Sequence, residues 1–182
     1  MGKSRSAYSI PGKQGKFDTH IIVVWVDNEA GVLARVVGLF SGRGYNIESL
    51  TVSEVDKKNH KSRISLVTTG TPMVIEQIKK LLEKLVPIHS VNDLTIGAPH
   101  VERELALIKI VNSGNQRVEA LRTADCFRAR TLDSSLNSFV FEITGSSSKI
   151  TAFIELMESL GKIEVVRTGI CGITRGNKLD MS

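Results

Sequence analysis

The sequence is poor in the groupings from which catalytic and metal sites are built. No nucleophile stands beside a base in a recognisable motif, and the four histidines are dispersed along the chain. The two cysteines, Cys126 and Cys171, lie far apart without a C-x-x-C spacing, which argues against a disulfide framework and a zinc ribbon. We therefore expect no catalytic residue, no metal site and no cofactor in this chain. Two unpaired thiols suit a reducing compartment.

Long hydrophobic runs are missing as well. The longest, Ile21 to Val26, has the length of a strand and falls far short of the roughly 20 residues that cross a membrane. The first residues contain no apolar segment of the kind that directs secretion. The sequence therefore predicts a cytoplasmic protein without a membrane contact.

Aromatic residues make up only 5% of the chain, which bears on nucleic-acid binding. Phe139-Val140-Phe141 resembles the aromatic pattern that RNA-recognition sheets use for base stacking, but the basic, glycine-containing part of that motif is missing before it. The net charge is +5, and four basic residues in the acid-free segment 1–17 account for all but +1 of it. We expect residues 1–17 to be a disordered basic tail, and we expect no nucleic-acid partner.

Beyond the tail, the hydrophobic periodicity changes in an order that is then repeated. In the first unit, β-branched and alternating runs predict strands, and two amphipathic stripes predict helices. The expected strands are 19–26, 47–55, 63–69 and 91–96, and the expected helices are 32–40 and 72–85. Thr71 is predicted to cap the second helix, with Pro72 at its first position.

Gly97-Ala98-Pro99 marks a boundary, after which the same order starts again. The second unit is expected to contain strands 105–111, 130–134, 139–143 and 163–173 and helices 115–127 and 147–160. Two βαββαβ units in tandem predict an α+β fold of two ferredoxin-like sandwiches, residues 18–97 and 98–178. Each sheet would carry two helices on one face and keep an open face or edge that needs a partner.

The turn between the first strand and the first helix carries the most informative residues. Asp27, Asn28 and Glu29 cluster at the strand end, and Gly31 follows at the helix start. A helix N-terminus has unpaired N–H groups and the positive end of the helix dipole, so it holds a carboxylate without a cationic side chain. This pattern favours the sensing of a small zwitterion over chemistry. Asn46 is expected at the opposite end of the sheet, so only two paired chains would bring it to the same ligand.

Two simpler interpretations remain open from the residues alone. Gly31 by itself fits a tight turn that binds nothing, and no G-x-G-x-x-G or phosphate-loop spacing accompanies the other glycines. His100-Val101-Glu102-Arg103-Glu104 alternates charges in the way that a solvated strand entry does. For this segment the sequence predicts an exposed start of the second unit.

Three stretches carry a resemblance to a known family. They are NEAGVLAR (28–35) with RGYNIESLTV (43–52), then HVEREL (100–105), and, more loosely, a Ser/Thr-Gly-hydrophobic triplet followed by Arg175-Gly176. With them the chain resembles, from about His20 to Lys178, the small regulatory subunits of acetolactate (acetohydroxyacid) synthase. The first half of these subunits is an ACT domain, an amino-acid-sensing module. Ala30 and Ala34 stand where many relatives carry Pro and Ser.

The resemblance implies a function and a site. The large catalytic subunit of that enzyme joins pyruvate to a second 2-keto acid with thiamine diphosphate, FAD and Mg²⁺. The small subunit raises its activity and confers feedback inhibition by valine or another branched-chain amino acid. The effector would lie between two ACT domains of a homodimer. The implied site residues are Asn28, Gly31, Val32 and Leu33 on one chain and Asn46 and Ile47 on the second.

Other classes of function stay open beside this one. A free-standing ACT-type sensor that regulates another enzyme would show the same first domain. RNA binding through the basic tail is a third class, whereas the absence of a helix-turn-helix pattern argues against direct control of DNA.

Overall fold

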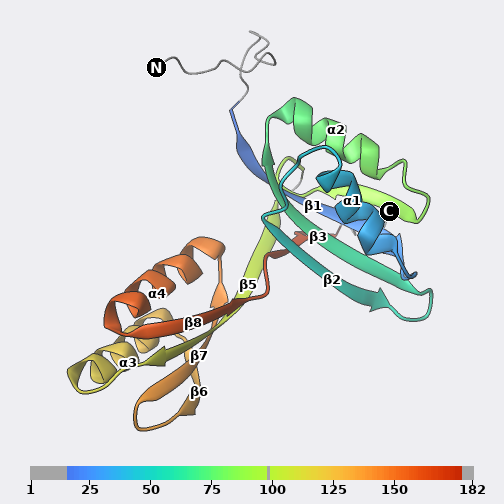
Figure 1. Ribbon diagram of the computed structural model, residues 1–182. Coiled ribbons are helices and arrows are strands. Elements are labelled where there is room, and N and C mark those ends of the chain that lie inside the picture. Colours follow the sequence, from blue (N-terminus) through green and yellow to red (C-terminus); the bar gives the residue numbers. More distant parts are fainter. Residues whose placement is uncertain (1–15, 98, 178–182) are drawn as a thin grey trace, which may run out of the picture.

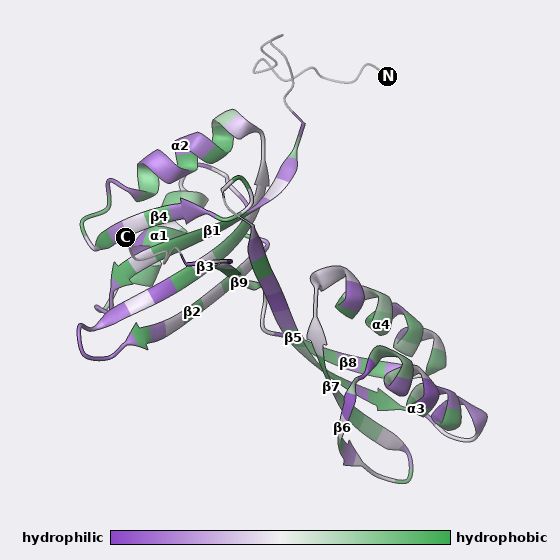
Figure 2. Ribbon diagram, turned by 180° about the vertical axis from the view of Figure 1, so that it is seen from behind, coloured by the Kyte–Doolittle hydropathy of each residue, from purple (hydrophilic) through white to green (hydrophobic). Residues whose placement is uncertain are grey.

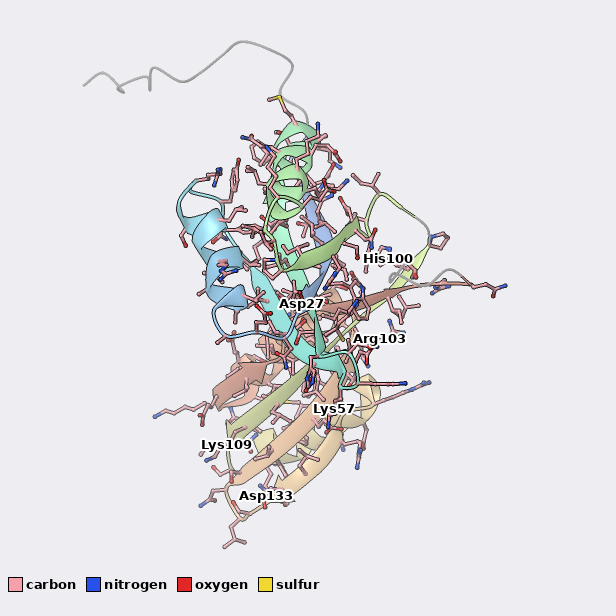
Figure 3. All side chains as sticks on the ribbon, turned by 90° about the vertical axis from the view of Figure 1, so that its right-hand side faces the viewer. Asp27, Lys57, His100, Arg103, Lys109 and Asp133 are labelled. Carbon is pink, nitrogen blue, oxygen red and sulfur yellow. The ribbon has the colours of Figure 1, made fainter. Side chains whose placement is uncertain are left out.

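The computed structural model describes residues 16–97 and 99–177, which form two domains placed end to end (Figure 1). The predicted basic tail lies outside the described residues except for Lys16 and Phe17. The long strand β5 (His100–Val111) connects the domains. In Figure 3 this strand runs from His100 and Arg103, beside the first domain, to Lys109 in the second.

The first domain is an antiparallel sheet with two helices on one face (Figure 1). Its strands, in spatial order, are β2 (Ser49–Asp56), β3 (Lys61–Gly70), β1 (Asp18–Asp27) and β4 (Ile88–Asp93), and its helices are α1 (Val32–Ser41) and α2 (Pro72–Leu82). Strands β1 and β2 both run antiparallel to β3, so they point in the same direction. The β1–α1 turn and the end of β2 therefore lie at the same end of the sheet.

Local sequence explains where these helices begin and end. Gly42 forms the C-cap of α1. Thr71 caps α2 as predicted, its hydroxyl accepting a hydrogen bond from the Val74 N–H, and Pro72 occupies the first turn. The apolar stripes of both helices pack on the inward face of β1, and Figure 2 shows the alternation of hydrophobic and hydrophilic residues along α2.

The second domain repeats this architecture. Its strand order is β6 (Arg130–Ser134), β7 (Ser138–Gly145), β5 and β8 (Lys162–Arg167), with helices α3 (Asn115–Phe127) and α4 (Ser147–Leu160). In both domains the first and third strands of the unit form the centre of the sheet, which is the ferredoxin-like arrangement. The predicted α+β class with two ferredoxin-like sandwiches is confirmed.

The aromatic pair on β7 belongs to the core of the second domain. Phe139 and Phe141 are 3% and 0% exposed and pack with residues of α3 and α4. The Arg117 guanidinium lies 3.7 Å from the centre of the Phe139 ring. Because both rings face the helices, they are not available for base stacking, and RNA binding loses the residues that suggested it.

The prediction of a single strand over residues 163–173 is wrong. The structure has two strands there: β8 pairs with the second half of β5, and β9 (Cys171–Thr174) pairs with its first residues. Between them Gly169 has a φ of 81°, in the left-handed region that glycine adopts without steric strain. Hydrophobic periodicity does not reveal this break, because apolar residues continue on both sides of it.

This break lets the end of the chain return to the first domain. β9 and residue Ile170 cover part of the sheet face that α1 and α2 leave free, over an apolar cluster of Ile21, Val23, Trp25, Val67 and Leu94. Gly172 approaches this cluster so closely that a Cβ there would lie 2.8 Å from Leu94 Cδ1. The Arg63 guanidinium of β3 donates a hydrogen bond to the Gly172 carbonyl. The open face expected on the first sheet is thus closed in part by the chain itself.

Several other boundaries differ from the prediction: β5 begins at His100 and not at residue 105, and α2 ends at Leu82 and not at residue 85. The fourth strand covers Ile88–Asp93 and not 91–96, because the Asp93 carboxylate accepts the Thr95 N–H at 2.9 Å and turns the chain. β2 begins at Ser49, so residues 47–48 belong to the loop before it.

Candidate functional site

The β1–α1 turn holds four of the predicted site residues close together. Gly31 has a φ of 86°, and no atom beyond Gly31 and its immediate chain neighbours lies within 4 Å of the position that a Cβ would occupy. The first full helical bond runs from the Arg35 N–H to the Gly31 carbonyl at 3.0 Å, and the Val32 N–H reaches the Glu29 carbonyl only at 3.4 Å. The Leu33 N–H therefore lies in the first turn, where helical geometry provides no acceptor. The turn offers open space beside backbone donors.

Neighbouring segments hold this turn in place. The Asn28 N–H donates to the His60 carbonyl at 2.7 Å, and the Asp27 N–H donates to the Pro87 carbonyl at 2.9 Å. The Asp27 carboxylate, labelled in Figure 3, lies 2.6 Å from His89 Nε2 of β4. Contacts from two sides fix the orientation of the turn, as a binding site requires.

Asn46 and Ile47 lie at the opposite end of the first sheet. The Thr68 hydroxyl donates to the Asn46 carbonyl at 2.7 Å, and Thr68 pairs with His20 near the start of β1. At roughly 3.3 Å per strand residue, the length of β1 from His20 to its end is more than 20 Å. One chain does not bring the two predicted halves of the pocket together.

The edge strand β2 offers a way for two chains to do so. Among the described residues it pairs only with β3, and its Val52 and Val55 are 44% and 49% exposed. A free strand edge is a template for pairing with another chain. If two β2 edges paired antiparallel, the loop before β2 of one chain would lie at the end of the other chain where the Gly31 turn is found.

A second polar site lies between the domains. A cavity of about 430 Å³ is bounded by the start of β2 and by the segment that joins β8 to β9. Glu48, Ser49 and Leu50 line it from the first domain, and Glu104, Ser147 and Arg167 line it from the second.

Glu104 is a buried charge with several partners in the wall of this cavity. Its side chain is 4% exposed and accepts hydrogen bonds from Arg167 Nε and Nη2, each at 2.7 Å. Arg167 Nη2 also donates to the Ser147 hydroxyl at 2.9 Å. The Arg167 hydrogen bonds hold the pKa of the Glu104 carboxyl below its ordinary value of 4.5, although burial acts in the opposite direction. The same pairing raises the pKa of Arg167.

The prediction of a solvated strand entry over residues 100–104 is therefore wrong for Glu104. Its side chain lies on the same side of β5 as Ala106, Ile108 and Ile110, which are all 0% exposed. This period of two is the signal in the sequence that would identify Glu104 as buried. Its partner Arg167, 63 residues away, has no such signal.

Comparison with family models assigns both domains. A model for an AHAS small subunit-like ACT domain matches residues 22–90, and a model for the small subunit of acetolactate synthase matches residues 103–176. An ACT domain followed by a second ferredoxin-like domain defines an ACT-type regulatory protein.

Similarity over the whole chain is more specific. The chain is 44% identical to the acetolactate synthase isozyme 3 small subunit of Salmonella typhimurium over 160 residues, 87% of this chain and 97% of that protein. With the acetolactate synthase small subunit of Aquifex aeolicus it shares 43% over 180 residues, 96% and 93% of the two chains. The crystal structure of the small subunit from Thermotoga maritima matches with a TM-score of 0.80 at 36% identity, covering 88% of this chain and 99% of that one. The chain belongs to the family of acetolactate synthase small subunits.

Family membership confirms that the chain is a regulatory subunit and not an enzyme by itself. Within the described residues, no helix is long and apolar enough to cross a membrane, and no three potential metal ligands form a group.

The Glu104–Arg167 pair generates a pH-dependent prediction. Because the folded-state pKa of Glu104 is depressed, its contribution to stability is complete above about pH 4.5 and is lost as the pH falls further. We expect Glu104→Gln to lower the free energy of unfolding by roughly 2 kcal/mol at pH 7. Urea denaturation should show this difference narrowing below pH 4.5.

Glu142→Gln is the matched control. Glu142 pairs with Arg130 at 3.5 Å on the surface, and the arginine is 77% exposed. Loss of this surface pair should lower the free energy of unfolding by less than about 1 kcal/mol at any pH. A Glu104→Gln effect that stays constant down to pH 3 would contradict the assigned ion pair.

Proposed function

We propose that this chain activates the catalytic large subunit of acetolactate synthase and makes it sensitive to inhibition by valine or another branched-chain amino acid. The large subunit would hold thiamine diphosphate, FAD and Mg²⁺ and join pyruvate to a second 2-keto acid. We place this assembly in the cytoplasm, a reducing compartment that suits the two free cysteines, Cys126 and Cys171.

The left-handed turn at Gly31, with open space beside its backbone donors, carries the proposal of an effector site. An α-carboxylate fits there because helix dipole and unpaired N–H groups both favour a negative charge. Gly31, Val32 and Leu33 would receive it, with the Asn28 side chain close by. Asn46 and Ile47 of a second chain would close the pocket, with carbonyl oxygens accepting the ammonium hydrogens.

The mechanism we propose is linkage between binding and assembly state. An effector held between two chains binds most tightly to the dimer arrangement that completes its pocket, and it shifts the population towards that arrangement. If the catalytic subunit is less active in that state, inhibition follows with a coupling on the order of 1–3 kcal/mol. Valine, leucine and isoleucine differ by methylene groups, which discriminate by only about 1–3 kcal/mol each.

The decisive experiment measures acetolactate formation by the matching large subunit in three mixtures. These contain the large subunit alone, with this chain, and with this chain plus valine. We expect stimulation by the chain and its reversal by valine. Absence of stimulation, with both proteins folded, would contradict the proposal and favour a sensor for another enzyme.

Substitution of Gly31 tests the carboxylate site. Asp and Asn both tolerate the left-handed region, and the space for a side chain is open, so either variant should fold. Gly31→Asp places a negative charge against the effector carboxylate. We expect it to raise the valine concentration for half-inhibition at least tenfold, or roughly 1.4 kcal/mol. Activation of the large subunit should persist.

Gly31→Asn is the control for this variant, because it has nearly the same shape without the charge. Its shift in valine response should be clearly smaller than that of Gly31→Asp. Asn28→Ala should also weaken the response. Normal valine sensitivity in both Gly31→Asp and Asn28→Ala would refute the site.

The dimer that we propose to form through β2 is tested by Val52→Lys. A lysine on an edge strand opposes pairing with another edge, because its charge would have to be desolvated. We expect sedimentation equilibrium to show at least a tenfold weaker dimer. Val118→Lys on α3, where the valine is 51% exposed, should leave the association unchanged. If the Val52→Lys and Val118→Lys variants associate equally strongly, the dimer contact does not lie at β2.

A further inference from the structure

The proposed effector loop continues directly into the contact between the two domains. After Asn46 and Ile47, the Glu48 N–H donates to the Val67 carbonyl at 2.8 Å, which fixes the loop to β3. Ser49 follows as the first residue of β2, and its hydroxyl accepts the Ile170 N–H at 3.0 Å. Only Glu48 separates the predicted effector residues from a hydrogen bond to the C-terminal segment.

The close approach at this contact depends on Gly169. A Cβ on Gly169 would collide with the Ser49 hydroxyl and lie 3.4 Å from Thr51 Cγ2. The φ of 81° at Gly169 is also one that other residues rarely adopt. The Gly169 backbone therefore lies directly against the Ser49 side chain, and no long flexible side chain separates them. A displacement of the start of β2 has to displace Gly169 and Ile170 too.

On its other side, Gly169 is attached to the second domain. Its N–H favours the charged form of the Glu104 carboxylate, which accepts hydrogen bonds from Arg167. Arg167 Nη2 also donates to the Ser147 hydroxyl in the first turn of α4 at 2.9 Å. The Thr168 N–H donates to the Leu105 carbonyl at 3.0 Å, which holds the same segment to β5. A short path of hydrogen bonds thus leads from β2 to α4 along one wall of the cavity between the domains.

We propose that Ser49 and Gly169 are positioning residues that transmit effector binding from the ACT domain to the C-terminal domain. This inference rests on the effector site proposed above. When the effector draws in the Asn46–Ile47 loop, the Ser49 hydroxyl carries the movement to Ile170 and Gly169, and the Glu104 cluster carries it to α4. Without the Ser49 hydroxyl, the effector still binds, but the second domain no longer follows.

The single tryptophan of the chain provides a direct readout. Trp25 is 8% exposed and lies in the apolar cluster against which Ile170 packs. Movement of Ile170 changes the surroundings of the indole, so the emission of Trp25 reports on the domain contact in the isolated chain.

The test uses the full chain with Ser49→Ala, and with Ser53→Ala as control. Ser53 lies on the same face of β2, four residues further on, and is exposed. Three quantities are measured: valine affinity of the chain alone by calorimetry, the change of Trp25 emission on saturation with valine, and inhibition of the reconstituted enzyme at saturating valine.

We expect Ser49→Ala to keep its valine affinity within about twofold while the emission change and the maximal inhibition each fall about fivefold or more, within the range of allosteric couplings. Ser53→Ala should behave like the wild type. Gly169→Ala should reproduce the Ser49→Ala pattern, because its Cβ separates the same two segments.

The possible failures are distinct. If wild-type chain binds neither valine, leucine nor isoleucine, the proposed function fails, and this inference fails with it. If the wild type binds and is inhibited, and Ser49→Ala shows the same emission change and the same inhibition, the inference alone is overturned. A parallel loss of affinity and inhibition in Ser49→Ala would make Ser49 part of the binding site and would likewise overturn it.

Discussion

The arrangement of the two domains depends on a buried carboxylate. Glu104 is removed from water, and a buried charge is tolerated only where hydrogen bonds and an opposite charge replace its hydration. Arg167 supplies the opposite charge and two hydrogen bonds, and Ser147 and Gly169, from two other segments, favour the charged form as well. Because all three have to converge on one side chain, the end of β8, the start of α4 and the return to the first domain are fixed together.

That return segment also changes what the first domain exposes. An ACT-type sheet with helices on one face leaves the other face bare, but here β9 and Ile170 cover an apolar cluster on it. The edge of β2 stays unpaired among the described residues. The chain thus covers part of a sheet face by itself and leaves a strand edge unpaired, and this is the edge at which we propose that two copies associate.

Regulation in such a protein needs a site that binds without reacting and a rigid route away from it. As the proposed effector site, the Gly31 turn would meet the first requirement, since its donors are backbone groups. In the route that we propose, the Ser49–Ile170 hydrogen bond and the close approach of Gly169 would meet the second. Direct contacts transmit small displacements because closely packed protein interiors are hard to compress.

The sequence by itself determined the order of helices and strands, the two ferredoxin-like units and the family, because hydrophobic periodicity and turn residues act locally. It also indicated Gly31 and Asn28 on one side and Asn46 on the other, since strand direction follows from the βαβ order. It did not reveal that residues 163–173 break at Gly169, that the Phe139 ring faces the helices, or that Glu104 pairs with Arg167. The break at Gly169 and the pairing of Glu104 depend on contacts between residues more than 60 positions apart. Phe139 packs against helix residues of its own domain. Only the tertiary structure decides which segments meet.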